Sequence, residues 1–289
     1  HGYSLNHAAR SLKLKRSDTI GFVVPDLSNA YFSRLMAALE ALCRKRNLLL
    51  LTVASHEDPE LENRAVTSLL ARGVDGLVVA PCQKASLPQL ISNKARASIV
   101  MFDRDYGSAQ FPTVVSDNFQ GGVEMTRRML ETAGAPFHFL CELAELPSIQ
   151  GRIQGFLSAC QASGVPDGEA LLRFGVEGTL SAGQQMMRAL ITELKGAPKA
   201  FMCSSLLVLE GALQELREQF GGIDKDILIG TFDDHTMLDL LPNRVFSIKQ
   251  NEVALAARVF ERLIEPASER NRHNQNDVVP SELICRNLS

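Results

Sequence analysis

IGFVVPDLSNAYFSRLMAALEALCRKR, residues 20–46, decides the fold that we predict for this chain. Its first five residues are apolar and too few for a helix, so they predict a buried strand that ends before Pro25. Ser28 or Asn29 then suits a helix cap, because either side chain can accept a hydrogen bond from a backbone N–H of the first turn. Apolar residues follow at helical spacing: Phe32, Leu35, Met36, Leu39, Leu42 and Cys43. Ligands of open α/β sheets bind at the carboxyl ends of strands, so the turn in this strand–turn–helix unit is a candidate binding edge.

The same alternation of strands and helices continues along the chain and then restarts. Alternation of this kind predicts parallel sheets with right-handed crossovers, and two runs of ordinary domain length predict two similar α/β lobes. The further strands are expected at residues 48–53, 76–80, 98–102, 114–115, 137–141, 171–174, 200–203, 227–231, 246–248 and near 283–284. The further helices are expected at residues 59–72, 87–94, 120–131, 149–163, 181–194, 207–219 and 253–263.

The composition is that of a soluble globular protein, with 289 residues of which 45% are hydrophobic and 22% charged. A net charge of −3 gives the chain no overall basic field for nucleic acid. The apolar runs are shorter than a membrane span and we recognise no signal-peptide core, so we expect no membrane contact and no export. The six cysteines are scattered and never form CxxC, which favours buried thiols in a cytoplasmic protein.

The first sixteen residues, HGYSLNHAARSLKLKR, form a basic leader with helical spacing over residues 6–13. A helix this short is marginal in water and needs a surface to order it. Two interpretations remain: a frayed, solvated leader, or a segment that folds only on DNA, with Leu12 as an apolar wedge in the minor groove. The candidate DNA-contacting residues are Asn6, His7, Ala9 and Leu12.

Patterns typical of enzymes are missing from the sequence. It contains no GxxxxGK[ST], no GxGxxG after a strand, no GxSxG and no HExxH, and its six histidines lack a nucleophile partner. Asp233, Asp234 and His235 form a cluster without matching metal-ligand spacing, which is a weak metal signal. We therefore expect no catalytic residue, no cofactor and no metal.

Several motifs, in their order along the chain, resemble one protein family. GYSLNHAARSLK resembles the hinge segment of the LacI family of bacterial transcription regulators, and residues 20–52 resemble the start of the effector-binding core of that family. LLARGVDGLVVAP, IVMFDRD, VVSDNFQGG, GRIQGF, DILIGTFDD and FSIKQN then follow in the order of the family. FDRDYGSAQFPTVVSDNFQGG and LPSIQGRIQGF look most like the fructose-responsive members. The resemblance covers essentially the whole chain.

This resemblance implies two periplasmic-binding-protein-like lobes joined by three crossovers, near Asn118, Gln250 and Val279. The implied division is a hinge segment at residues 1–16, a first lobe at residues 17–118 and 251–279, and a second lobe at residues 119–249 and 280–289. Strand-end residues of both lobes are then expected to face one interlobe cleft and to bind the ligand. They are Asn29, Tyr31, Phe32, Asp103, Arg104, Arg152, Ser204, Ser205, Asp233 and Gln250.

The chemistry of these residues suits a sugar that carries a phosphate. Carboxylates accept hydrogen bonds from vicinal hydroxyls, aromatic rings cover an apolar sugar face, and arginines bind phosphate through a planar fork. We expect Arg152 in the first turn of its helix, where the helix dipole disfavours a cation unless an anion is bound, and the family resemblance makes Arg152 the residue that grips the sugar. Arg104, flanked by two aspartates, suits a local ion pair as well as a phosphate contact. Ser204 and Ser205 stand where the family often has Asn-Asp, which puts that hydroxyl contact in doubt.

The resemblance implies a cytoplasmic homodimer that binds operator DNA through an N-terminal helix-turn-helix and the paired hinge segments. First-lobe helices would form the dimer, with Leu35, Leu42 and Leu69 as outer apolar positions. The implied effector is fructose 1-phosphate, with fructose 1,6-bisphosphate a weaker candidate. Its binding would change the angle between the lobes, separate the hinge helices and lower operator affinity. The alternative is a sugar-binding protein of a transport or chemotaxis system with the same bilobal fold.

Overall fold

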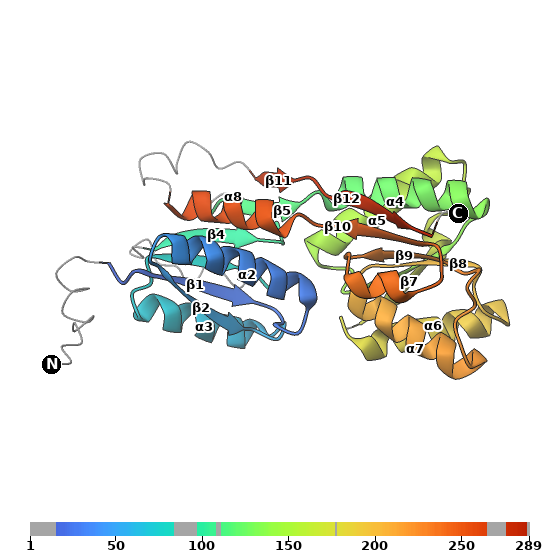
Figure 1. The fold of residues 1–289 in the computed structure, drawn as a ribbon, viewed down its shortest axis with the longest axis horizontal. Helices are drawn as coiled ribbons and strands as arrows, with labels where there is room; N and C mark the ends of the chain where they lie inside the picture. Colours follow the sequence, from blue (N-terminus) through green and yellow to red (C-terminus); the bar gives the residue numbers. More distant parts are fainter. Residues whose placement is uncertain (1–15, 84–96, 108–110, 177, 265–275, 288–289) are drawn as a thin grey trace. The chain divides into compact units, whose positions relative to one another are not determined.

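Two six-stranded sheets form the framework of the computed structural model (Figure 1), which describes residues 16–83, 97–107, 111–176, 178–264 and 276–287. Each sheet belongs to its own compact unit. The first lobe comprises His1–Val115 and Glu252–Val279, and the second lobe comprises Ser116–Asn251 and Pro280–Ser289. The chain therefore passes from one lobe to the other three times.

The first sheet has the strand order β11-β5-β4-β3-β1-β2, and the neighbouring strands from β5 to β2 run parallel. Its strands are β1 (Thr19–Val24), β2 (Leu49–Ala54), β3 (Gly76–Val79), β4 (Ser98–Phe102), β5 (Thr113–Ser116) and β11 (Asp277–Val279). The helices described in this lobe are α2 (Ala30–Lys45), α3 (Pro59–Ala71) and α8 (Glu252–Ile264).

Helices cover both faces of this first sheet, which is why β3 and β4 are buried throughout. Phe22 and Val24 of β1 pack with α2 and α8, whereas Val23 between them packs with α3. This alternation follows from strand geometry, since successive side chains point to opposite faces of the sheet. The short turn after β1 thus lies at the carboxyl edge of a rigid, doubly covered sheet.

The second sheet has the strand order β12-β10-β9-β8-β6-β7. Its strands are β6 (His138–Glu142), β7 (Leu172–Gly175), β8 (Ala200–Cys203), β9 (Leu228–Phe232), β10 (Val245–Lys249) and β12 (Glu282–Arg286). Its helices are α4 (Asn118–Ala133), α5 (Pro147–Ala162), α6 (Leu180–Leu194) and α7 (Leu206–Phe220), with the short 3-10 helices η1 (Glu169–Leu171) and η2 (Thr236–Leu240).

The four helices of the second lobe cover its sheet in two pairs. Residues of α4 and α5 share one core with Phe139 of β6, and residues of α6 and α7 share another with the adjacent Leu140. Within the first pair, a Cβ atom on Gly155 would clash with the backbone oxygen of Phe119 and would come within 2.8 Å of the backbone nitrogen of Val123. Glycine at residue 155 therefore lets α4 and α5 lie in close contact, which fixes the start of α5 beside the start of α4.

The predicted fold class is confirmed: each lobe is a parallel sheet flanked by helices. Two details differ from expectation, because β12 runs antiparallel to β10 and β11 adds an unexpected strand to the first sheet. The chain leaves the first lobe after Val115, three residues before Asn118, the residue near which this crossover was expected and the first residue of α4. The expected helix at residues 87–94 lies outside the described residues, as do the candidate DNA-contacting residues Asn6, His7, Ala9 and Leu12.

The residues expected on an outer dimer surface are mostly core residues. Leu35 of α2 and Leu69 of α3 are buried within their own lobe, so that expectation was wrong for both. Leu42 is partly buried against the same core as Leu35. Helical spacing selected the inward face of each helix, since the apolar stripe of an amphipathic helix normally covers its own sheet. None of the helices that the structure describes is long and apolar enough to cross a membrane.

Candidate functional site

The turn after β1 supplies a helix cap and two core rings. The Asn29 side chain caps α2 by accepting a hydrogen bond from the Tyr31 backbone N–H at 3.0 Å. Tyr31 and Phe32 are buried in the core of the first lobe, and the Tyr31 ring stacks on Phe102 with 6.1 Å between ring centroids. All three residues thus lie at the carboxyl edge of the first sheet, and each has a structural role there.

Arg104, just after β4, forms a local ion pair, one of the two alternatives that the sequence left open. Its side chain is only 4% exposed and forms a two-pronged ion pair with Glu57, at 2.7 Å from Nη1 to Oε2 and 2.5 Å from Nη2 to Oε1. Nη1 also donates to the carbonyl oxygen of Pro81 at 3.1 Å. Burial alone would lower the pKa of Arg104, but the hydrogen bonds and charge of Glu57 raise it. The local ion pair is therefore the arrangement in the structure, with Glu57 rather than an adjacent aspartate as the main partner.

Asp103 and Asp105 lie on either side of this arginine. Asp103 is buried, and its Oδ2 lies 3.7 Å from Nε of Arg104. Asp105 accepts a hydrogen bond from the backbone N–H of Gly107 at 2.8 Å and another from the side chain of Asn276. The carboxyl edge of the first sheet therefore combines one arginine with the carboxyl groups of Glu57 and Asp103.

Arg152 is the central cation of the second lobe. It is 5% exposed, and its guanidinium group lies over the Phe232 ring, 4.4 Å from the centroid. Nε donates to Oδ1 of Asn118 at 2.8 Å and Nη1 donates to the carbonyl oxygen of Ser204 at 2.5 Å. Nη2 donates to no side chain or backbone group in the part of the chain that the structure describes.

The expected position of Arg152 in its helix was wrong by one turn. α5 begins at Pro147, which suits the first helical position because proline has no N–H to leave unpaired. Arg152 is therefore the sixth residue of the helix and lies in the second turn. The effect of the helix dipole is concentrated in the first turn, so the argument for an anion must come from the contacts of Arg152 rather than from its place in the helix.

Asp233 and Gln250 are joined at the same edge of the second sheet. Gln250, just after β10, donates from Nε2 to Oδ1 of Asp233, which follows β9. The Oε1 atom of Gln250 accepts a hydrogen bond from the hydroxyl of Ser116. Both side chains are buried, so the pair holds the ends of neighbouring strands in register.

Glu142 is a site residue that the sequence did not bring to our attention. It is the last residue of β6, is 6% exposed, and its Oε2 accepts hydrogen bonds from the hydroxyls of Ser204 at 3.1 Å and Ser205 at 3.0 Å. Burial raises the pKa of this carboxyl to about 7, although both serine hydroxyls and the charge of Arg152 act to lower it. The charge of Asp233 contributes to this raised pKa. An available signal was its place directly after a predicted strand, like that of Asp103 and Asp233.

Ser204 and Ser205 make further hydrogen bonds beside this carboxyl. The Ser204 hydroxyl also accepts a hydrogen bond from the Glu142 backbone N–H at 3.1 Å, and the Ser205 hydroxyl caps α7 by accepting from Val208 N–H at 3.3 Å. The second sheet thus gathers five of the predicted site residues, with Glu142 and Asn118, at one carboxyl edge. These five are Arg152, Ser204, Ser205, Asp233 and Gln250.

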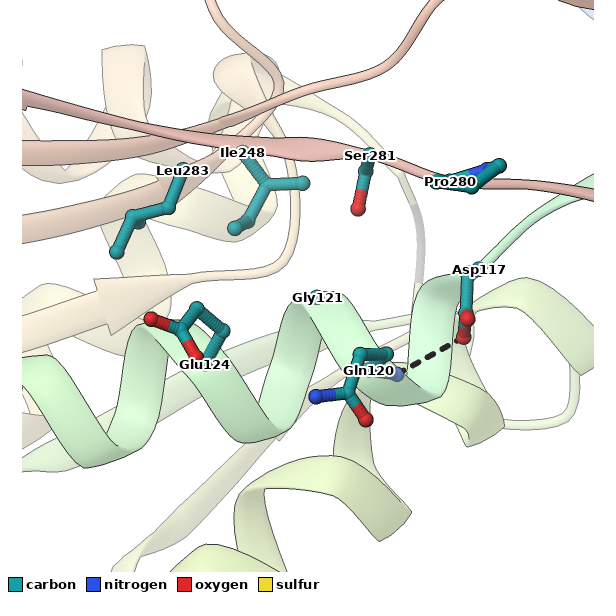
Figure 2. A pocket seen from close by; sticks show the side chains of 8 residues that line it. All are labelled: Asp117, Gln120, Gly121, Glu124, Ile248, Pro280, Ser281 and Leu283. Atoms are coloured by element: carbon teal, nitrogen blue, oxygen red, sulfur yellow. Dashed lines mark hydrogen bonds between the residues drawn. The ribbon is translucent and has the colours of Figure 1, made fainter.

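A separate hollow of about 130 Å³ lies in the second lobe beside α4 (Figure 2). Asp117 caps the helix there by accepting from Gln120 N–H at 3.0 Å, and Glu124 lies one turn further on. None of the predicted site residues lines this hollow, which is formed by Asp117, Gln120, Gly121, Glu124, Ile248, Pro280, Ser281 and Leu283. Among the residues described, no group of three or more His, Cys, Asp or Glu side chains is arranged to hold a metal ion.

Comparison with known proteins supports a regulatory role for these two lobes. Residues 20–264 match the family model of the periplasmic binding protein domain. The chain is 32% identical over 260 residues to the sucrose operon repressor of Klebsiella pneumoniae, a match that covers 88% of this chain and 75% of that protein. The chain belongs to the LacI family of transcription regulators.

Two further relatives of this LacI-family chain are named for a fructose operon or solved with a fructose phosphate. The fructose operon regulatory protein of Vibrio cholerae is 28% identical over 287 residues, covering 99% of this chain and 86% of that protein. A crystal structure of the Cra transcriptional dual regulator from Pseudomonas putida, in complex with fructose 1-phosphate, superposes with a TM-score of 0.79 at 27% identity and covers 93% of this chain and 98% of that one. These relatives are regulators rather than enzymes, which supports the expectation that the chain has no catalytic activity.

Proposed function

We propose that this LacI-family chain is the effector-sensing and dimerising core of a cytoplasmic, sugar-responsive transcription regulator. Its effector in this proposal is a phosphorylated sugar, with fructose 1-phosphate favoured over fructose 1,6-bisphosphate. The observation that carries the proposal is Arg152, which is held rigidly by Asn118 and Ser204 while its Nη2 donates to no described residue. A related structure with fructose 1-phosphate bound supports the choice of ligand.

The energy available at Arg152 is sufficient for a regulatory switch. A hydrogen bond from a charged donor contributes about 1.5–3 kcal/mol, and allosteric coupling in regulators is typically about 1–3 kcal/mol. One or two bonds from Nη2 to a ligand oxygen therefore cover the required range. For this energy to affect DNA binding, the ligand must bind one conformation of the chain better than another. The proposed output is a lower affinity for operator DNA, passed on through the hinge segment.

A neutral sugar is the second candidate, and the carboxyl groups of the second lobe are the observation in its favour. Arg152 is accompanied there by the carboxyl groups of Glu142 and Asp233. A dianionic phosphate would meet these carboxylates at a cost, whereas a neutral sugar would find hydroxyl acceptors in them. The match to a sucrose operon repressor fits the same alternative.

We also propose that the chain forms a homodimer, and that the dimer surface lies at the edge strand β2 rather than at Leu35 and Leu69. β2 is an edge strand of the first sheet among the residues described, and its Leu49 and Val53 are 58% and 37% exposed. An exposed apolar edge strand promotes association with another chain unless it is covered. Beside this edge, an open groove of about 900 Å³ runs along β2 and α3. A second copy of the chain would cover Leu49 and Val53.

Calorimetric titration of the purified chain tests the effector. The ligands are fructose 1-phosphate, fructose 1,6-bisphosphate, fructose, sucrose and inorganic phosphate, each at pH 7. We expect the strongest binding for fructose 1-phosphate and at least tenfold weaker binding for fructose and for phosphate alone. Stronger binding of fructose or sucrose would favour the neutral-sugar alternative, and equal or absent heats for all five would contradict effector sensing by this core.

A further inference from the structure

Glu142 carries an inference that deepens the proposed function and rests on it. The carboxyl is held by two hydroxyl donors on one oxygen, Oε2, while its other oxygen, Oε1, accepts no hydrogen bond from a described residue. Some buried side-chain atoms of the described residues are sealed from solvent and lack a partner, but Oε1 of Glu142 is not one of them. A carboxyl group at least nine-tenths buried, with one oxygen left open at the ligand edge of its sheet, is equipped to contact a ligand.

The groups around Glu142 determine what it can select. Arg152 of α5 is the cation that acts on it, and Asp233 after β9 is the nearby carboxylate. Burial raises the pKa of the Cys141 and Cys203 thiols, and the charge of Glu142 raises both further. Glu142 and Arg152 influence each other electrically without a direct ion pair, so a ligand that contacts both would respond to the charge on each.

We propose that Glu142 is a specificity-determining residue that sets the charge of the effector accepted at Arg152. A ligand with a phosphate requires the protonated carboxyl. The ionised carboxyl favours a neutral sugar, one hydroxyl of which donates a hydrogen bond to Oε1. The protonated form donates a hydrogen bond where the ionised form only accepts one. Binding of a sugar phosphate therefore takes up about half a proton at Glu142 at pH 7 and nearly one at pH 8.5, whereas binding of a neutral sugar releases up to about half a proton at pH 7 and almost none at pH 8.5.

The size of the effect follows from proton linkage. Because the pKa of Glu142 is raised to about 7, the fraction of protein with a protonated carboxyl falls about tenfold for each pH unit well above that value. The affinity for fructose 1-phosphate should therefore weaken by about tenfold between pH 7 and pH 8.5. The second pKa of a phosphate ester is about 6, so the ligand itself stays dianionic over this interval and its own titration does not produce the change.

The test compares wild type with Glu142→Gln by calorimetric titration of fructose 1-phosphate and fructose at pH 7, 7.75 and 8.5, in two buffers of different ionisation enthalpy. We expect the wild type to lose about tenfold in phosphate-ester affinity and to show buffer-dependent heat from proton uptake. In Glu142→Gln both effects should vanish, while the ratio of fructose 1-phosphate to fructose affinity at pH 8.5 rises by about tenfold. Glu145→Gln is the matched control, because this exposed carboxyl lies three residues further along, and it should behave as wild type.

A second variant keeps the native carboxyl. Ser204→Ala removes one hydroxyl that stabilises the ionised form of Glu142, so the loss of affinity should begin at a higher pH. The same pH dependence in wild type, Glu142→Gln and Ser204→Ala would overturn the role of Glu142 while leaving the sugar-phosphate proposal intact. Absence of binding to wild type at every pH would instead remove the proposed function itself. Thermal unfolding of each variant establishes that it is folded before titration.

Discussion

Replacement of Arg152 by alanine should destabilise the second lobe as well as weaken effector binding. The substitution removes the donors to Oδ1 of Asn118 and to the carbonyl oxygen of Ser204, at 2.8 and 2.5 Å. Both acceptors belong to buried residues, and a buried acceptor left unpaired costs about 1–3 kcal/mol. Loss of the contact with the Phe232 ring adds about 0.5–2 kcal/mol. Relief from burying a charge offsets part of this, so the net loss of unfolding free energy should be about 3 kcal/mol.

Thermal unfolding of the two variants Arg152→Ala and Arg217→Ala measures this loss. For a lobe of this size, about 3 kcal/mol corresponds to roughly 10 °C in Tm. Arg217 is an exposed arginine on α7 of the same lobe, and its replacement should change Tm by no more than about 2 °C. Arg152→Lys keeps the charge but cannot reproduce the two directed hydrogen bonds of a planar guanidinium group. Its Tm should therefore lie between the Tm values of Arg152→Ala and Arg217→Ala.

The result that would refute this reasoning is a Tm for Arg152→Ala within about 2 °C of wild type, combined with lost binding of fructose 1-phosphate. That outcome would mean that Arg152 serves the ligand alone and that its two hydrogen bonds contribute little to the folded lobe. A large fall in Tm for Arg152→Lys, equal to that of alanine, would instead show that the directed bonds matter more than the charge.

Two further predictions concern the same lobe. Gly155→Ala should destabilise the lobe by about 1–3 kcal/mol, because the added Cβ would clash with α4. Gly196→Ala is the control and should be close to neutral, because no atom lies within 4 Å of the added Cβ. Urea unfolding of both variants measures the two changes in unfolding free energy. Glu142 has a pKa raised from 4.5 to about 7, so the folded state binds more protons than the unfolded chain between these values and stability falls as pH rises through them. The unfolding free energy of Glu142→Gln should therefore rise relative to that of wild type by up to about 3 kcal/mol between pH 4.5 and pH 8, at about 1.4 kcal/mol per pH unit. Urea unfolding at both pH values measures this change. An equal difference between variant and wild type at the two pH values would contradict the prediction.

Local sequence patterns were sufficient to predict the architecture of this chain. Strands such as β4 (Ser98–Phe102) and β8 (Ala200–Cys203) begin and end where the apolar runs do, because burial on both faces demands a continuous apolar segment. The antiparallel strand β12 and the added strand β11 were not predictable in the same way. Their pairing depends on where the chain returns after α8, and nothing in a short edge strand specifies its direction.

Partners distant in sequence explain what was missed at the candidate site. Arg104 is flanked by two aspartates in sequence, yet its main partner is Glu57, 47 residues away, because the loop before α3 brings that carboxylate to the end of β4. Arg152 was assigned to the right edge of the sheet but to the wrong turn of its helix, since Pro147 and Ser148 start α5 earlier than the apolar spacing indicated. The sequence was sufficient to predict which residue types lie at the strand ends. Their hydrogen-bond and ion-pair partners depend on the tertiary fold.

Glu142 shows that the charge available to a ligand depends on the carboxyl groups around Arg152 as well as on Arg152 itself. The sequence drew attention to Arg152 as an anion site, and a lone buried arginine would indeed favour a phosphate. The structure adds a carboxyl at the end of β6, held by the hydroxyls of Ser204 and Ser205. If Glu142 is ionised, much of the charge of Arg152 is already balanced by Glu142 and Asp233, and a neutral ligand suffices. In our proposal the choice between a sugar and a sugar phosphate depends on one proton at Glu142, because that proton determines whether the positive charge of Arg152 remains available to a phosphate.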